Sequence, residues 1–202
     1  MTPSRRHDTR RPAPRAALDA VAERLVRPRT ADAQELTEGT RARLRAIAHR
    51  LAHGRDVSDR RGRSAGRPAS TTILLAGARG TGQTLAATEL AHELGRPLYR
   101  IDLSQVVSEY IGETEKNLDR VFDAAAQADA ILLFDEGEAL FGKRSEVKDS
   151  HDRYAGADTE YLLQRMAAYP GVAILATNVP GCPNATFARR FDSVVECGEG
   201  AE

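Results

Sequence analysis

The chain has 202 residues, of which 41% are hydrophobic, 29% are charged and 5% are aromatic. This length allows one α/β domain with a smaller appendage, and the sequence contains no apolar run near the roughly 20 residues that a membrane-spanning helix needs. The two cysteines, Cys182 and Cys197, exclude a disulfide framework and lack metal-ligand spacing, so we expect a cytoplasmic protein with reduced thiols.

The net charge of zero conceals two oppositely charged parts of the chain. Residues 1–70 contain 17 arginines, no lysine and 8 acidic residues, which gives a net charge of +9. Residues 71–202 contain 12 basic and 21 acidic residues, which gives −9. This split predicts a domain boundary near residues 68–70. Arginine outnumbers lysine by 26 to 3, which favours a bacterial source with a GC-rich genome.

The basic part of the chain is predicted to contain a tail, a helical segment and a linker. Residues 1–15 are rich in arginine and proline, without apolar periodicity, which is typical of a disordered basic tail. A basic arm that contacts nucleic acid or an acidic partner is the alternative, but the tail has no aromatic side chain to stack on bases. Residues 16–70 are expected to form two amphipathic helices that pack on the main domain, followed by a polar linker at 55–70. The apolar positions of these helices are Leu18, Val21, Ala22 and Leu25, then Leu44, Ile47, Ala48 and Leu51, with Gly54 as the second C-cap.

Residues 71–197 alternate short apolar runs with amphipathic helical patterns. Strands are predicted at 72–76, 98–102, 130–135, 172–177 and 193–196. Helices are predicted near 84–94, 114–127, 158–168 and 185–190. Strands that alternate with helices in this way favour an α/β fold, in which a parallel sheet is covered on both faces.

The loop after the first of these strands has the pattern of a phosphate-binding loop, with glutamine in place of its lysine. Glycines let successive N–H groups converge on an anion, and the following helix adds the positive end of its dipole. Gln83 can donate only a neutral hydrogen bond, so we expect weaker nucleotide binding and slower turnover. Arg79 could replace the missing charge, but we expect its side chain to point outward. The candidate nucleotide-binding residues are Gly77, Ala78, Arg79, Gly80, Thr81, Gly82, Gln83, Thr84 and Leu85.

Two further apolar strands end in polar side chains. Residues 131–134 lead directly into Asp135 and Glu136, and buried charges are costly unless they serve a metal or a reaction. We assign Thr84 and Asp135 to Mg²⁺, and Glu136 to the base that polarises an attacking water. Asn178 follows the strand at 172–177, and we expect it to position water near the γ-phosphate. A plain turn residue is the alternative interpretation of Asn178.

Two adjacent arginines, Arg189 and Arg190, lie just before the last predicted strand. One of them would be suited to act in trans on the nucleotide of a neighbouring subunit, as an arginine finger does. The alternative is a surface helix end whose arginines form ion pairs. We therefore predict a catalytic set of Glu136, Asn178, Arg189 and Arg190.

The order of phosphate loop, Asp-Glu strand, Asn strand and paired arginines resembles the AAA+ ATPases over about residues 41–196. Within that family, the chain is similar to a bacterial subgroup found beside phage-tail-like contractile injection systems, in its segments LYRIDLS (98–104), YIGETEKNL (110–118) and ALFGKRS (139–145). The resemblance implies a three-layer P-loop NTPase core with parallel sheet order 5-1-4-3-2, with the five predicted strands numbered along the chain. It also implies ATP and Mg²⁺ as cofactors, a hexameric ring with itself or an AAA+ paralogue, and a protein client. Tyr110, Ile111 and Gly112 match the loop that lines the central pore.

Two features depart from the family pattern. Gln83 replaces the phosphate-loop lysine, and the residues after the last strand show no helical pattern, so we expect the family's helical lid to be absent. Our leading hypothesis is an ATP-binding remodelling or assembly factor with reduced hydrolysis. The alternative is a non-catalytic scaffold or a regulatory subunit of a mixed ring. A nucleic-acid-associated protein driven by the basic segment is a third hypothesis, and nucleic acid is not an expected partner.

Overall fold

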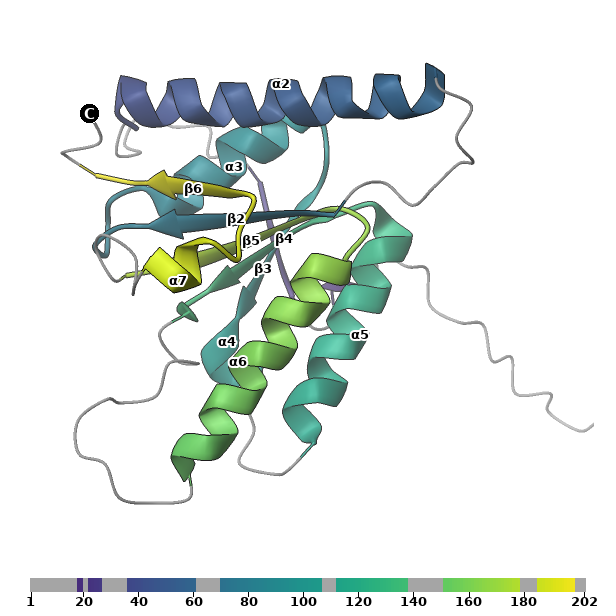
Figure 1. The fold of residues 1–202 in the computed structure, drawn as a ribbon, viewed down its shortest axis with the longest axis vertical. Coiled ribbons are helices and arrows are strands. Elements are labelled where there is room, and N and C mark those ends of the chain that lie inside the picture. Colours follow the sequence, from purple (N-terminus) through teal and green to yellow (C-terminus); the bar gives the residue numbers. More distant parts are fainter. Residues whose placement is uncertain are drawn as a thin grey trace, which may run out of the picture.

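The computed structural model describes residues 18–19, 22–26, 36–60, 70–106, 112–137, 151–178 and 185–198. Within these ranges, six strands form one sheet in the order β1-β3-β4-β5-β2-β6 (Figure 1). Their bounds are Glu23–Leu25 (β1), Thr71–Ala76 (β2), Leu98–Asp102 (β3), Ile131–Asp135 (β4), Val172–Thr177 (β5) and Ser193–Glu196 (β6). Among the helices of this part of the chain, none has the length and apolarity to cross a membrane.

The five strands from β2 to β6 confirm the predicted sheet order. β2 pairs in parallel with both β5 and β6, and β4 pairs in parallel with both β3 and β5. The carboxyl ends of β2, β4 and β5 therefore lie side by side at one edge of the sheet. Because ligands of open α/β sheets bind outside the carboxyl ends of the strands, this edge is the expected site.

Helices cover both faces of the sheet and complete three layers (Figure 1). The apolar residues of β4 alternate between two cores, with Leu132 and Phe134 in one and Ile131 and Leu133 in the other. The first core includes α5 and α6, and the second includes α2 and α3. This alternation follows from the period of two along a strand, and it explains why the strands read as continuous apolar runs. The helices are α2 (Glu38–Arg60), α3 (Gln83–Leu94), α4 (Leu103–Val106), α5 (Glu113–Ala128), α6 (His151–Ala168) and α7 (Ala185–Ala188).

The first predicted N-terminal helix is wrong over most of its length. Leu18 and Asp19 are helical, but Glu23–Leu25 forms β1, which pairs antiparallel with β3. The apolar spacing of Leu18, Ala22 and Leu25 fits a helix, yet the open edge of β3 offers backbone partners that a helix cannot use. Tertiary pairing therefore overrides the local pattern, and Leu18 is fully buried in the core beside α5 and α6.

The second N-terminal helix is confirmed, but it is longer than predicted. Gly54 lies inside α2 and is not its C-cap, since the helix continues to Arg60. A glycine within a helix costs only about 1 kcal/mol relative to alanine, which does not end a helix whose other residues favour it. α2 packs Leu44, Ile47 and Ala48 into the core that it shares with α3. The predicted tail at 1–15 lies outside the described residues, as do residues 199–202.

Candidate phosphate-binding site

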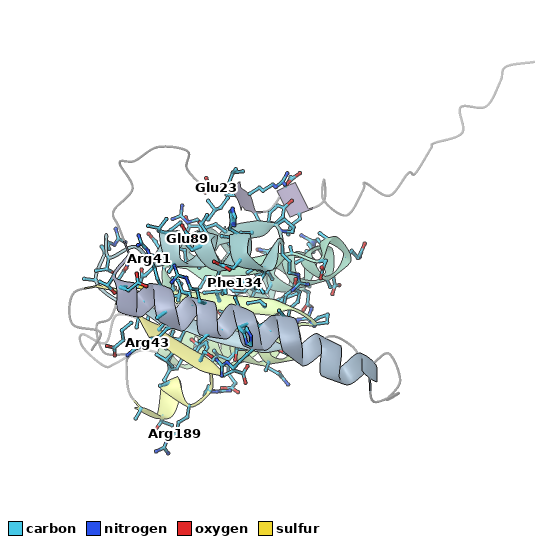
Figure 2. All side chains as sticks on the ribbon, turned by 90° about the horizontal axis from the view of Figure 1, so that it is seen from above. Glu23, Arg41, Arg43, Glu89, Phe134 and Arg189 are labelled. Carbon is cyan, nitrogen blue, oxygen red and sulfur yellow. The ribbon has the colours of Figure 1, made fainter. Side chains whose placement is uncertain are left out.

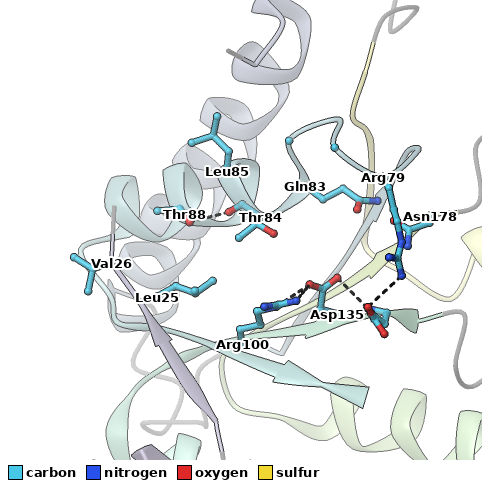
Figure 3. Close-up of a pocket in the computed structure, with 13 residues that line it drawn as sticks. Leu25, Val26, Arg79, Gln83, Thr84, Leu85, Thr88, Arg100, Asp135 and Asn178 are labelled. Atoms are coloured by element: carbon cyan, nitrogen blue, oxygen red, sulfur yellow. Dashed lines mark hydrogen bonds and ion pairs between the residues drawn. The ribbon is translucent and has the colours of Figure 1, made fainter. Parts of the chain in front are cut away.

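An open pocket of about 650 Å³ lies at the carboxyl edge of the sheet (Figure 3). Side chains from β1, the loop after β2, α3, β3 and the ends of β4 and β5 line it. Of the residues proposed from the sequence, the pocket brings together Arg79, Gly80, Gly82, Gln83, Thr84, Leu85, Asp135, Glu136 and Asn178. The structure thus gathers the phosphate loop, the Asp-Glu pair and the asparagine in one place.

The loop between β2 and α3 is shaped by two glycines. A Cβ on Gly77 would lie 2.3 Å from the carbonyl oxygen of Cys197, so only glycine fits where β2 passes the end of β6. Gly82 has a φ of +92° and precedes α3 without a side-chain cap. The first N–H groups of a helix have no intrahelical partner, and together with the helix dipole they favour an anion. The uncapped start of α3 therefore suits a phosphate group.

Gln83 turns its amide toward the floor of the loop. Its Nε2 atom donates to the carbonyl oxygens of Thr177 at 2.6 Å, Gly77 at 3.2 Å and Leu75 at 3.3 Å, and the residue is 9% exposed. Because this NH₂ group has two hydrogens and already serves three acceptors, it keeps no proton for a phosphate. The expectation that Gln83 donates to a phosphate is therefore wrong for this conformation. The side chain instead ties β2 and its loop to the end of β5.

Asp135 accepts hydrogen bonds on both of its carboxylate oxygens. Arg100 of β3 places Nε and Nη2 each 2.8 Å from Oδ2, and the backbone N–H of Glu136 donates to Oδ1 at 2.9 Å. Burial alone would lower the pKa of Arg100, but the charge of Asp135 and the hydrogen bond to it raise that pKa above its ordinary value. Arg100 also lies 3.4 Å from Glu23 of β1. The carboxylate of Asp135, which we assigned to Mg²⁺, is thus paired with the Arg100 guanidinium of the protein itself.

Glu136 has a left-handed backbone and an ion pair of its own. Its φ of +58° is uncommon for a residue other than glycine, and such strain gathers at functional sites. Arg79 Nη2 lies 3.2 Å from Glu136 Oε1. The Arg79 side chain is 75% exposed, as expected of a side chain that points outward, but its guanidinium bends back to the carboxylate of Glu136 (Figure 3). Each of the two arginines thus holds one of the two acids.

A family comparison decides what kind of domain carries this site. The family model described as "ATPase family associated with various cellular activities (AAA)" matches residues 73–199, more than half of the chain. The chain belongs to this family. Membership implies nucleotide binding, and members of the family generally assemble into rings.

Relatives and solved structures agree with this assignment. The AAA domain is 34% identical to an uncharacterized AAA family ATPase, y4kL, of Sinorhizobium fredii over 61% of this chain and 37% of that protein. It is 33% identical to a Cell division cycle protein 48 homolog of Archaeoglobus fulgidus over 62% of this chain and 18% of that one. The chain thus spans well under half of either relative. The FIGL-1 AAA domain in complex with ADP superposes with a TM-score of 0.64 at 20% identity, over 97% of this chain and 64% of that chain, and shares the fold.

The paired arginines of this AAA domain lie away from the pocket and differ in their contacts. Arg190 Nη2 lies 2.7 Å from Glu160 of α6, and this hydrogen bond lowers the pKa of Glu160 below its ordinary value. Arg189 is exposed and points away from the domain (Figure 2), and within the described residues it has no ion-pair partner. Of the two predicted finger residues, Arg190 is therefore held in an ion pair within the domain, and Arg189, among the described residues, is not.

The described lining of the pocket does not include every predicted site residue, and some pocket residues were missed. Tyr110 and Ile111 are outside the described residues, whereas Gly112 has a φ of 77° and precedes α5. The missed pocket residues are Leu25, Val26, Thr88 and Arg100. A charged residue inside the apolar strand at 98–102 was the available signal for Arg100. For β1, the sequence carried no comparable signal.

Magnesium fits this AAA site only in part. Within the described residues, no group of three or more His, Cys, Asp or Glu side chains could hold a metal. Mg²⁺ at nucleotide sites needs few protein ligands, because phosphate and water oxygens complete its shell. The hydroxyl of Thr84 lies in the pocket and suits this role. Asp135 suits it less, because Arg100 and the Glu136 N–H already occupy its oxygens.

Proposed function

We propose that this AAA domain binds ATP as an ATP-dependent remodelling or assembly factor whose hydrolysis is impaired by Gln83. The observation that carries the proposal is the pocket itself, which joins an uncapped helix start to Asp135, Glu136 and Asn178. An anion cradle alone would suit many ligands. A cradle facing a carboxylate pair and an amide suits a phosphoryl group attacked by water.

In this proposal each residue has a distinct role. The N–H groups of the loop and of the first turn of α3 bind the phosphates, and Glu136 accepts a proton from the attacking water. Asn178 orients that water, and Arg189 of a neighbouring subunit stabilises charge in the transition state. When bound beside Thr84, Mg²⁺ would neutralise phosphate charge. To act as a base, Glu136 must first leave Arg79, which makes release of that ion pair part of activation.

Gln83 sets the expected level of activity. A lysine would add a charge-assisted hydrogen bond worth about 1.5–3 kcal/mol, or about 10- to 150-fold in affinity. The transition state should lose at least as much, because charge develops on the transferred group. The Gln83 amide points inward and donates to Thr177, so it does not replace the lysine even with a neutral hydrogen bond to the phosphate. This supports a loss of affinity at the upper end of that range.

The test compares the wild-type protein with Gln83→Lys. We expect the variant to bind a fluorescent ATP analogue about 10- to 150-fold more tightly and to hydrolyse ATP faster. Arg45→Gln, which removes an exposed charge on α2, serves as the control and should match wild type. Equal turnover by wild type and Gln83→Lys would contradict the role given to Gln83. Absence of nucleotide binding in both proteins would favour the alternative, a scaffold or regulatory subunit of a mixed ring.

The cellular setting of this function is also a proposal. The segments at 98–104 and 110–118 support a cytoplasmic bacterial factor that works beside a contractile injection system, as a hexamer or in a mixed ring. Tyr110, Ile111 and Gly112 would grip a protein client in the pore. Sedimentation of the protein with ATP tests ring formation. A neighbouring gene for a paralogue with the phosphate-loop lysine would support the mixed ring, and a monomer at all protein and ATP concentrations would oppose both assemblies.

A further inference from the structure

The carboxylate expected to meet a metal is already paired with a cation from β3. Arg100 makes two contacts of 2.8 Å with the same oxygen of Asp135, through Nε and Nη2. The Asp135 side chain is 17% exposed and that of Arg100 is 35% exposed, so water screens this pair less than a surface ion pair. The guanidinium keeps its charge at every physiological pH.

The strand register explains why Arg100 reaches this carboxylate. Arg100 pairs with Leu133 on β4, and Asp135 lies two residues further along, so the three side chains share one face of the sheet. Leu133 belongs to the core that includes α3, so this is the face below the phosphate loop. From the other side, β1 places Glu23 in register with Arg100. The fold thus fixes the guanidinium between two carboxylates at the pocket floor.

The charged side chains that line the pocket, two arginines and two acids, have a net charge of zero without a bound ion. Arg79 and Arg100 are its cations, and Asp135 and Glu136 are its anions, each paired with one arginine. A phosphate loop with lysine would carry one more positive charge. A divalent cation at Asp135 would have to displace the guanidinium or lie beside it, against like-charge repulsion.

We propose that Arg100 is a resident counter-cation at Asp135, which takes the place of a divalent cation there and makes nucleotide binding largely independent of Mg²⁺. The guanidinium has donors beyond those that Asp135 and Glu23 use, and it lies in the pocket that would hold the phosphates. It therefore supplies positive charge to a metal-free nucleotide. This inference rests on the proposed nucleotide binding, and it concerns only how the negative charge of the nucleotide is neutralised.

The experiment measures the dissociation constant of a fluorescent ATP analogue in excess Mg²⁺ and in excess EDTA. For wild type, the ratio of the EDTA value to the Mg²⁺ value should stay within about threefold. Arg100→Gln should raise that ratio at least about tenfold, the effect of one charge-assisted contact. Arg100→Lys keeps the positive charge, so its ratio of the two dissociation constants should lie close to that of wild type. Arg45→Gln is the matched control, because it removes an arginine whose ion pair with Glu38 lies on α2, and its ratio should equal that of wild type.

Asp135→Asn supplies a second measurement that does not depend on the folding of the Arg100 variants. Without the carboxylate charge, the guanidinium keeps only its contact with Glu23 and can turn toward the phosphates, so affinity in EDTA should rise by about threefold or more. A ratio of about 30 or more for wild type that Arg100→Gln leaves unchanged would overturn the counter-cation while nucleotide binding stands. A loss of affinity on Asp135→Asn that occurs only with Mg²⁺ would also overturn it. No binding in either condition would overturn the proposed function and this inference with it.

Discussion

The phosphate loop and the Asp135–Glu136 edge face the same pocket, but they satisfy their polar groups by different means. The loop relies on backbone groups and one neutral amide, since Gln83 is buried and serves three carbonyl oxygens. The edge relies on charge, because each carboxylate is paired with an arginine. A ligand that enters the pocket must therefore compete with charged partners at the acidic edge only. The loop is a preformed cradle, whereas the edge must release the ion pair between Arg79 and Glu136.

The largest expected effect separates the chemical role of the edge from the binding role of the loop. In the Gln83→Lys background, Glu136→Gln should lower the ATPase rate by about 10²–10⁴-fold, the usual contribution of a general base. The dissociation constant for ATP should stay within about threefold, because the neutral side chain keeps its shape and the loop still binds the phosphates. Steady-state ATPase assays and equilibrium binding on the same preparations measure both quantities. A parallel loss of binding and turnover would contradict this division between the two regions.

The second effect tests whether the cradle is rigid. Gly77→Ala should lower the free energy of unfolding by about 3 kcal/mol, because its Cβ would meet backbone atoms that cannot move away. Gly95→Ala is the matched control, since its φ of +63° is strained for alanine but its Cβ meets nothing within 4 Å. Its cost should be about 1 kcal/mol. Urea denaturation measures both variants, and equal losses would show that the contact with Cys197 does not constrain the loop.

The strands and the pocket residues at the ends of β4 and β5 could be read from the sequence, because each depends on local apolar runs and on the positions where they end. The order of the strands in the sheet came from the resemblance to the AAA+ ATPases. What could not be read depends on contacts between distant segments. β1 is three residues long and its apolar spacing fits a helix, so only the open edge of β3 decides its conformation. The direction of the Gln83 amide depends on the carbonyl oxygen of Thr177, 94 residues away. Arg100 is visible as an unusual strand residue, but its partner follows from the register of β3 and β4.

The third effect concerns the hydrogen bonds by which the uncharged Gln83 side chain joins the phosphate loop to β5. Gln83→Met keeps a side chain of similar shape but leaves three buried carbonyl oxygens without this donor, so it should lower the free energy of unfolding by about 1–3 kcal/mol. Thr88→Val removes one hydrogen bond within α3, to the carbonyl oxygen of Thr84, and should cost less than about 1 kcal/mol. Urea denaturation at fixed pH compares the two. A cost for Gln83→Met no greater than that of Thr88→Val would contradict the proposed tie between the loop and β5.

The smallest effect distinguishes the two ion pairs of the edge. The Arg79–Glu136 pair has side chains that are 75% and 34% exposed, whereas Arg100 and Asp135 are 35% and 17% exposed. A double-mutant cycle with Arg79→Ala and Glu136→Ala should give a coupling energy of about 0–1 kcal/mol that falls further in high salt, as for other exposed pairs. The cycle with Arg100→Ala and Asp135→Ala should give a larger coupling that salt changes less, because solvent screens it less. This order is what activation requires, since Glu136 must leave its arginine to act on water, while Asp135 keeps its partner. A stronger, salt-resistant coupling between Arg79 and Glu136 would mean that the base is locked in place, and hydrolysis would then fail for a reason independent of Gln83.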